Sequence, residues 1–169
     1  MCKKRGADLP TVAQLEYLAS NFGRSTFLWG DEAPACDEAI AGRAVGVLHG
    51  DGSCVKDPNG AFLPLSAETL ASTRDVLDVD GSSVYGLASN LAEWTRDGLT
   101  PPTAACQGSG SGILRDPECP SDVSDSVIIH GGAFSMPPAE TAASIRAAVH
   151  RTATRVDVGF RCTRPNIPL

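Results

Sequence analysis

One stretch of the chain has the spacing and the end signals of a helix. Thr11-Val12-Ala13-Gln14 has the form of a capping box, because the hydroxyl of its first residue can accept from the backbone of the fourth while the fourth side chain reaches back. Behind this box, apolar residues recur at Leu15, Leu18 and Ala19. A stop signal follows at Asn21 to Gly23. We therefore predict a helix between Thr11 and Asn21.

Strand signals are short and lie in the second half of the chain. The β-branched run Val127-Ile128-Ile129-His130 predicts a strand, and Gly131-Gly132 follows it, where a missing Cβ permits unusual dihedrals or close backbone approach. Val158 to Thr163 predicts a final strand, with His130 as an ordinary strand-edge residue. Val84 to Trp94 has the mixed apolar pattern of an element packed on the core.

Two further segments have helical propensity without a decisive period. Ala67 to Leu77 favours a short helix within a stretch that is otherwise rich in Gly, Pro and Asp turn signals. Ala139 to Val149 also favours a helix, but its assignment stays open. Asp78-x-Asp80-Gly81 lacks the remaining oxygen ligands of an EF-hand loop, so we interpret it as a solvated turn.

Composition predicts one loop-rich domain over residues 1–169. Gly 17 and Pro 12 exceed average usage, which favours short elements joined by loops. A Gly/Ser/Pro-rich stretch at about residues 100–120 carries two cysteines of its own and is predicted to be a tied insertion. No G-x-S-x-G elbow supports a serine hydrolase, and Gly108 to Gly112 is interpreted as a flexible loop.

The net charge of −6 and the sequence pI near 4.9 exclude two classes of partner. Nucleic acids and anionic membranes both require a dense basic surface, which an acidic chain of this kind lacks. No apolar stretch approaches the roughly 20 residues that cross a bilayer, and the first residues lack the apolar core of a signal peptide. We therefore expect no nucleic-acid partner and no membrane segment in this chain.

The six cysteines predict disulfides in preference to a metal site. None of them forms the closely spaced pairs that structural zinc sites use. An even number in a loop-rich chain indicates three disulfides and an oxidising, extracytoplasmic compartment, whether periplasmic, cell-surface or secreted. Six cysteines allow about fifteen pairings, so the residues alone do not choose among them.

Five short segments, taken in order, resemble the formylglycine-generating enzyme family, also called sulfatase-modifying factors. They are Leu9-Pro10-Thr11, Trp29-Gly30-Asp31, Asn90-Leu91-Ala92-Glu93-Trp94, Gly131-Gly132-Ala133-Phe134 and Gly159-Phe160-Arg161-Cys162. The resemblance implies an α+β, C-type-lectin-like fold with little regular structure, extended near Arg146. Because the family's domain begins well upstream of its Leu-Pro-Thr segment, the resemblance also implies an N-terminally truncated domain, the C-terminal part of something longer.

The resemblance also implies one disulfide. In the family, a cysteine seven residues before the Leu of Leu-Pro-Thr is bonded to the cysteine of Gly-Phe-Arg-Cys, and these positions are Cys2 and Cys162 here. Proximity along the chain then suggests the other two pairs, which are Cys36 with Cys54 and Cys106 with Cys119.

The family's chemistry depends on residues that this chain lacks. Its enzymes oxidise a substrate cysteine to formylglycine with copper held by two thiolates, the soft ligands that select Cu(I). Counting forward from the Gly-Gly pair, the resemblance places these ligands at Met136 and Thr141. The family's serine after Gly-Gly is Ala133, and the first Trp of its Trp-Glu-Trp is Ala92. We therefore expect no copper, and we favour a protein that is not an enzyme.

A calcium site of the family is only partly retained. Ser89 and Leu91 can offer backbone carbonyls and Glu93 a carboxylate, but the side-chain oxygen of the family is lost at Gly86. Hard cations take roughly six to eight oxygens. Two interpretations stay open, a degenerate calcium site or a core carboxylate that pairs with an Arg such as Arg161.

The resemblance also places a ligand-binding groove. Residues after the Gly-Gly pair and in a later basic cluster line the exposed groove of the family. Here they are Ser135, Met136, Arg146, His150 and Arg151, with Arg155 nearby. An anionic small molecule, a peptide or another protein would suit this cluster, although a solvated face and internal ion pairs explain it about as well.

The favoured function is a secreted bacterial pseudoenzyme, an exported binding or interaction module. The alternative is an accessory domain of a larger enzyme of the same family, as in iron sulfoxide synthases, and a formylglycine-generating oxidase comes after it. Retroelement-diversified variable proteins share the fold but carry Asn- and Tyr-rich ligand positions. Residues 139–151 have neither Asn nor Tyr, which disfavours that class.

Overall fold

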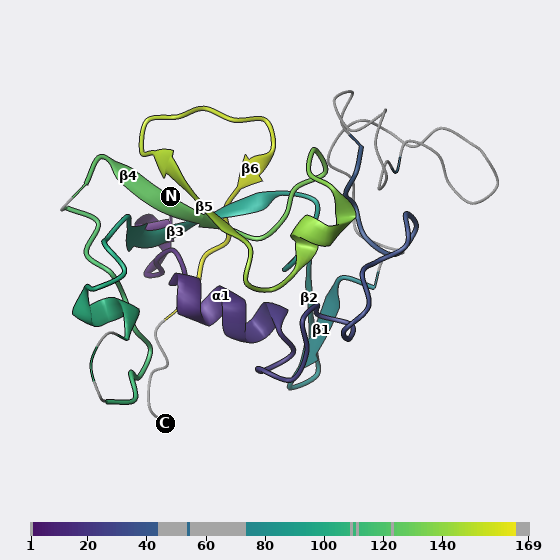
Figure 1. Ribbon diagram of the computed structural model, residues 1–169, viewed down its shortest axis with the longest axis horizontal. Helices are drawn as coiled ribbons and strands as arrows, with labels where there is room; N and C mark the ends of the chain where they lie inside the picture. Colours follow the sequence, from purple (N-terminus) through teal and green to yellow (C-terminus); the bar gives the residue numbers. More distant parts are fainter. Residues whose placement is uncertain are drawn as a thin grey trace.

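A computed structural model describes residues 2–43, 54, 74–108, 110, 112–122 and 124–164. Its elements are short and are joined by long loops (Figure 1). In chain order they are η1 (Cys2–Arg5), α1 (Val12–Ala19), β1 (Val76–Val79), β2 (Ser82–Tyr85), β3 (Ala92–Gly98), η3 (Ala105–Gln107), β4 (Ser126–His130), η4 (Pro138–Thr141), β5 (Arg146–His150) and β6 (Val158–Gly159). This mixture of helix and sheet confirms the α+β fold class.

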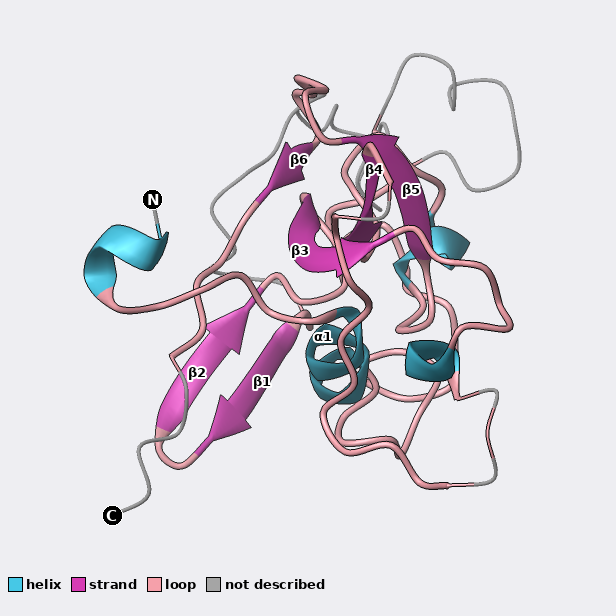
Figure 2. Cartoon of the chain, turned by 90° about the vertical axis from the view of Figure 1, so that its left-hand side faces the viewer, coloured by secondary structure: helices cyan, strands magenta, loops and turns pink. Residues whose placement is uncertain are grey.

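The strands form two sheets. In the larger sheet the order is β5-β4-β3-β6, with antiparallel pairing except between β3 and β6, which are parallel. The smaller sheet is the β1-β2 hairpin, which lies beside α1 (Figure 2). Its turn has positive φ at Asp80 and Gly81, so the predicted solvated turn is confirmed. β5 therefore forms one edge of the larger sheet.

Helix α1 begins as its sequence predicts. The Gln14 amide donates to the Thr11 hydroxyl over 3.1 Å, and the Thr11 amide donates to the Gln14 side chain over 3.0 Å, which completes the capping box. Leu15 and Ala19 on the buried side of α1 join an apolar cluster with Leu28, Leu77, Leu87 and Ala143. The helix is thus fixed between a local cap and a core to which distant segments contribute.

A second apolar cluster lies against the larger sheet. Its buried members are Ala92 of β3, Ile129 of β4 and Ala133, and Trp94, Met136, Val149 and Val158 pack against them. The predicted strand over residues 127–130 is confirmed as part of β4. The predicted final strand is shorter than expected, because only Val158–Gly159 pair with β3 and Thr163 instead bridges to Asp8.

Neither segment with helical propensity forms an α-helix in the described residues, and the chain is extended at Arg146 as the resemblance implied. The segment Ala139 to Val149 is divided between η4 and strand β5, whose residues pair with β4 over their whole length. Residues 67–73 of the second segment lie outside the described chain, but Val76 and Leu77 belong to β1 and pair with β2. In both places cross-strand pairing overrides local helical propensity.

Three disulfides tie the chain together, and their pairing is the expected one. They join Cys2 to Cys162, Cys36 to Cys54 and Cys106 to Cys119. The first connects η1 to the segment after β6 across a separation of 160 residues. The third closes the predicted insertion, and its Cys106 lies within η3.

The Gly131-Gly132 pair allows two backbones to approach closely. Gly131 has a φ of +85°, and its amide donates to the Ile145 carbonyl. A Cβ on Gly132 would lie 2.5 Å from the carbonyl oxygen of Glu140. The predicted reason for this pair is therefore confirmed. Within the described residues, no helix is long and apolar enough to cross a membrane.

Candidate functional site

A groove of about 490 Å³ lies between α1, the larger sheet and the insertion. Apolar side chains form most of its wall, and charged groups enter it at a few points. The lining residues include Val12, Ala13, Glu16, Asp97, Leu99, Pro102, Leu114, Ile128, Arg146 and Ala148. Leu99 and Leu114 remain 45% and 42% exposed, so this apolar surface is open to a ligand.

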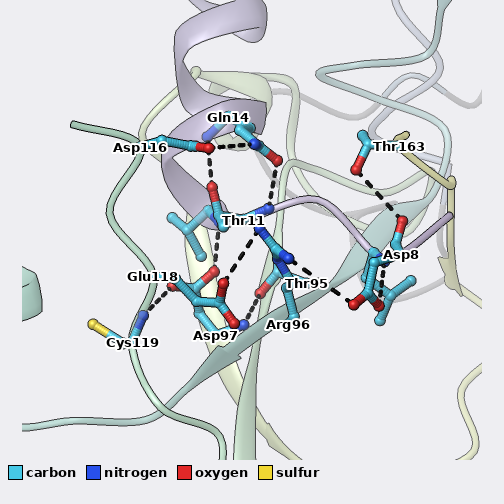
Figure 3. A network of polar contacts seen from close by, with 12 residues as sticks. Asp8, Thr11, Gln14, Thr95, Arg96, Asp97, Asp116, Glu118, Cys119 and Thr163 are labelled. Atoms are coloured by element: carbon cyan, nitrogen blue, oxygen red, sulfur yellow. Dashed lines mark hydrogen bonds and ion pairs between the residues drawn. The ribbon is translucent and has the colours of Figure 1, made fainter. Parts of the chain in front are cut away.

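Asp97 fixes the wall of the groove by joining three segments (Figure 3). One carboxylate oxygen accepts from the Val12 amide at the start of α1, and the other accepts from the Cys119 amide of the insertion, each over 2.8 Å. Both backbone groups and the carboxylate are buried. A negative charge at a helix N-terminus is favourable, because unpaired N–H groups meet there. Asp97 therefore has a structural role, which sequence reasoning missed because no local pattern marks it.

β5 has two different faces, because side chains alternate along a strand. Arg146, Ala147 and Ala148 line the groove, together with Ile128, the partner of Ala148 on β4. Val149 instead packs on the apolar cluster that contains Met136. Of the five predicted ligand-binding residues, Arg146 lies in the groove wall, while Met136 lies on the opposite side of the sheet. Arg146 itself is half-exposed, with its guanidinium 4.0 Å from the Glu16 carboxylate.

The rest of the basic cluster is held by contacts within the protein. Arg151 donates to the backbone carbonyls of Ser121 and Ser124. His150, at the end of β5, contacts the Thr152 hydroxyl over 2.8 Å and is exposed. Internal contacts therefore account for part of this cluster, as the second interpretation expected.

Ser135 belongs to a separate polar group beside β6. Its hydroxyl donates to Asp157 over 2.8 Å, and Arg155 donates two hydrogen bonds to the same carboxylate over 2.9 and 2.8 Å. These bonds from Arg155 hold the pKa of Asp157 below its usual value. The five residues predicted to form one groove thus lie in four places: Arg146 in the groove wall, His150 and Arg151 at the end of β5, Met136 in the apolar cluster and Ser135 in the polar group beside β6.

Glu93 pairs with Arg161, as one of the two open interpretations expected. Arg161 donates to both carboxylate oxygens of Glu93, each over 2.6 Å. It also donates to the backbone carbonyls of Tyr85 and Gly86, over 3.0 and 2.8 Å. Burial raises the pKa of the Glu93 carboxyl, and the bonds from Arg161 oppose that rise. A guanidinium thus provides positive charge where the resemblance places a calcium ion.

Ser89, one of the two backbone positions of that calcium site, contacts a second buried carboxylate, Asp75. Asp75 is fully buried and accepts from the amides of Leu87, Ala88 and Ser89 and from the Ser89 hydroxyl. The Ser89 carbonyl accepts from the Leu91 amide over 3.0 Å. Asp75 was not singled out by the sequence, because its ligands are backbone amides that carry no residue-type signal.

His130 is a core residue, and its interpretation as an ordinary strand-edge residue is wrong. Its side chain is 1% exposed, and Nε2 lies 2.8 Å from the Ala143 carbonyl. Because a carbonyl only accepts, Nε2 carries the proton. Burial lowers the pKa of His130 to about 4. The imidazole is therefore neutral at pH 7 and joins β4 to the segment before β5.

Comparison with protein families identifies the domain. The model of the sulfatase-modifying factor enzyme 1-like domain matches residues 1–166. The chain belongs to this family. No curated protein is significantly similar to it.

Three solved structures are similar in fold to this sulfatase-modifying factor domain. PvdO from Pseudomonas aeruginosa has a TM-score of 0.58 and 22% identity, over 95% of this chain and 54% of that one. Treponema denticola variable protein 1 has a TM-score of 0.63 and 20% identity, over 94% and 48%. CarF has a TM-score of 0.52 and 16% identity, over 94% and 47%. The chain spans about half the length of these proteins, and at these identities the likeness shows the fold alone.

At the copper positions of the sulfatase-modifying factor family, this chain has side chains that are held by packing and by an internal hydrogen bond. Thr141 is buried, and its hydroxyl donates to the Pro138 carbonyl over 2.7 Å. Met136 packs against the apolar cluster on β3 and β4. All six cysteines are in disulfides, so none provides a thiolate. The donor set does not fit a two-thiolate copper site. Among the described residues, no group of three His, Cys, Asp or Glu side chains is placed to hold a metal.

Proposed function

We propose that this sulfatase-modifying factor domain is a non-catalytic binding module that acts outside the cytoplasm. The observation that carries the proposal is the state of Met136 and Thr141. One side chain is part of an apolar cluster and the other closes a turn through its hydroxyl, so both have packing roles in place of copper ligation. A domain that keeps the fold but lacks these thiolates would act by binding a partner at its surface.

The groove beside α1 supports the binding role. Its wall combines exposed apolar side chains with one half-exposed cation, Arg146. Ligand pockets commonly pair apolar walls with a few placed polar groups. Three disulfides support an oxidising compartment, because thiols stay reduced in the cytosol.

A formylglycine assay tests the non-catalytic part of the proposal. The protein is incubated with a cysteine-containing sulfatase peptide, Cu(I) and oxygen, beside a formylglycine-generating enzyme as the positive control. We expect the peptide thiol to remain unchanged by mass spectrometry. Aldehyde formation above the level of a no-protein sample would overturn the proposal.

A further inference from the structure

Within the described part of the chain, strand β5 forms an edge of the larger sheet and pairs with another strand on one side only, β4. Gly131 donates to the Ile145 carbonyl and Arg151 donates to the Asp125 carbonyl, each over 2.9 Å. In an antiparallel pair, every second residue of a strand bonds to the neighbouring strand. These two bonds show which residues of β5 do so. The odd-numbered residues of β5 therefore bond to β4. The N–H and C=O groups of Arg146 and Ala148 point away from it.

The edge is accessible as well as unpaired. Four of the five β5 residues are exposed, and Val149 is partly buried. We find no partner within the described chain for the backbone groups of Arg146 and Ala148. An edge of this kind is a template for an added strand.

The groove lies on the face to which an added strand would direct its side chains. Arg146, Ala147 and Ala148 all line the groove, and so does Ile128, which pairs with Ala148. Because paired residues share a face of the sheet, the side chains of Arg146 and Ala148 lie on the groove face. Residues directly opposite on an added strand share that face. An apolar residue opposite Ala148 would thus meet the open apolar surface that includes Leu99 and Leu114.

The charges on and next to β5 favour an acidic peptide over a second copy of the chain as the added strand. β5 carries Arg146 at its start and His150 at its end, Arg151 follows directly, and the strand has no acidic residue. A second copy of the chain added in antiparallel fashion would bring Arg146 near the other copy's Arg151, and like charges opposite one another are destabilising. An acidic peptide meets the opposite sign at both ends. Two acids line the groove: Glu16 lies against Arg146, and Asp97 is buried and accepts from the backbone amides of Val12 and Cys119.

We propose that the free edge of β5 binds an extended acidic peptide by strand addition. Its carboxylates lie opposite Arg146 and His150, and an apolar residue between them faces the groove. This inference rests on the proposed binding function and specifies the partner of that same groove.

The probe is the capped peptide Glu-Thr-Leu-Thr-Glu, whose sequence is the same in both directions. Binding is followed by NMR on the ¹⁵N-labelled protein, because a short peptide is expected to bind weakly. We expect the amide resonances of Arg146, Ala148 and His150 to shift most. The matched peptide Lys-Thr-Leu-Thr-Lys should bind at least about tenfold more weakly, since a charge-assisted contact is replaced by repulsion.

Backbone methylation of the peptide tests strand addition without changing the protein. In an antiparallel addition the Leu N–H points to β5 and the Thr N–H groups point away, while a parallel addition reverses these roles. One methylated peptide, carrying N-methyl Leu or N-methyl Thr, should therefore lose binding while the other keeps it. If both bind equally, or both fail while the unmodified peptide binds, the strand-addition proposal is wrong.

Two charge variants of the protein test the choice of partner. Arg146→Glu should reverse the preference between the Glu and Lys peptides, and Glu16→Gln should strengthen binding of the Glu peptide by removing its competitor for Arg146. Thermal melts show whether either variant is folded, and the methylated peptides remain decisive if Arg146→Glu is not. An unchanged preference in folded variants, or no binding of the Glu peptide at all, would overturn this inference. The proposal that the domain is non-catalytic is tested separately, because only aldehyde formation in the formylglycine assay would overturn it.

Discussion

Arg161 and Glu93, which are 68 residues apart in the sequence, form a two-point ion pair with both N···O distances at 2.6 Å. The same guanidinium group also bonds to the carbonyls of Tyr85 and Gly86. One side chain after β6 thus connects the end of the β1-β2 hairpin to strand β3. In this domain the pair closes the core at the place where the family resemblance implied a metal ion.

Replacement of Arg161 should destabilise the protein strongly. Arg161→Ala would leave the buried Glu93 carboxylate without its partner, and breaking a buried pair costs about 3–5 kcal/mol. Arg161→Lys should recover part of the loss, because an ammonium cannot bond to both carboxylate oxygens and the carbonyls in the same geometry. Urea unfolding measures the difference. Lys4→Ala, an exposed control in η1, should stay within about 0.5 kcal/mol of the unmodified protein.

Calcium should leave the melting temperature of the unmodified protein unchanged. Arg161 already balances the charge of Glu93 and bonds to the Gly86 carbonyl, so a second cation there would meet repulsion. Thermal melts in EDTA and in excess calcium check this expectation. A rise with calcium that Glu93→Gln abolishes would contradict it, and would instead support an ion held by Ser89, Leu91 and Glu93.

Loss of the Asp97 carboxylate should loosen both α1 and the insertion. Asp97→Ala would leave the buried amides of Val12 and Cys119 without acceptors. Hydrogen bonds to charged groups contribute about 1.5–3 kcal/mol each, so we expect a loss of about 3 kcal/mol or more. Asp116→Ala is the matched control, since that exposed carboxylate accepts from the Gln14 side chain at the surface. If the two substitutions lower the free energy of unfolding equally, Asp97 does not hold α1 and the insertion together.

Acid should destabilise the domain through His130. The pKa of this buried imidazole is lowered to about 4, so its stabilising contribution is complete above pH of about 6.5 and is lost as the pH falls towards 4. In that window the unfolded chain takes up a proton that the folded chain does not. The loss should amount to about 3 kcal/mol by pH 4.

The acid effect is measured by unfolding His130→Gln beside the unmodified protein from pH 7 to pH 4. Glutamine can still donate to the Ala143 carbonyl but does not titrate. The variant should therefore lose less stability than the unmodified protein as the pH falls. Parallel pH profiles of the two proteins would rule out His130 as the source.

The disulfides should contribute unequally to stability. The chain-entropy model gives about 5 kcal/mol for the Cys2–Cys162 bridge and about 3 kcal/mol for the shorter loop between Cys106 and Cys119. Replacing both cysteines of each pair with Ser, one pair at a time, should thus lower the melting temperature more for the first pair. Peptide mapping without reductant confirms which pairs remain, and a greater loss for the insertion pair would contradict the model.

Local signals determined several elements correctly. The Thr11–Gln14 capping box needs only residues within one helical turn, and it predicted the start of α1. The β-branched run predicted β4, and the ordered family segments predicted the fold and the Cys2–Cys162 disulfide. For the helix start and the strand, the information lies within a few adjacent residues. For the fold and the disulfide, it lies in the family resemblance, which implies both the architecture and the pairing of these two cysteines.

Tertiary structure alone decided the roles of the polar side chains. Whether Glu93 pairs with Arg161, whether His130 is buried and which segments Asp97 joins all depend on atoms tens of residues away. The same holds for β5, where pairing with β4 made a strand of a segment with helical propensity and placed Arg146 and Met136 on opposite sides of the sheet. The sequence specifies the chemistry of each group, but hydrogen bonds, charge and burial act between neighbours in space, and long-range packing determines those neighbours.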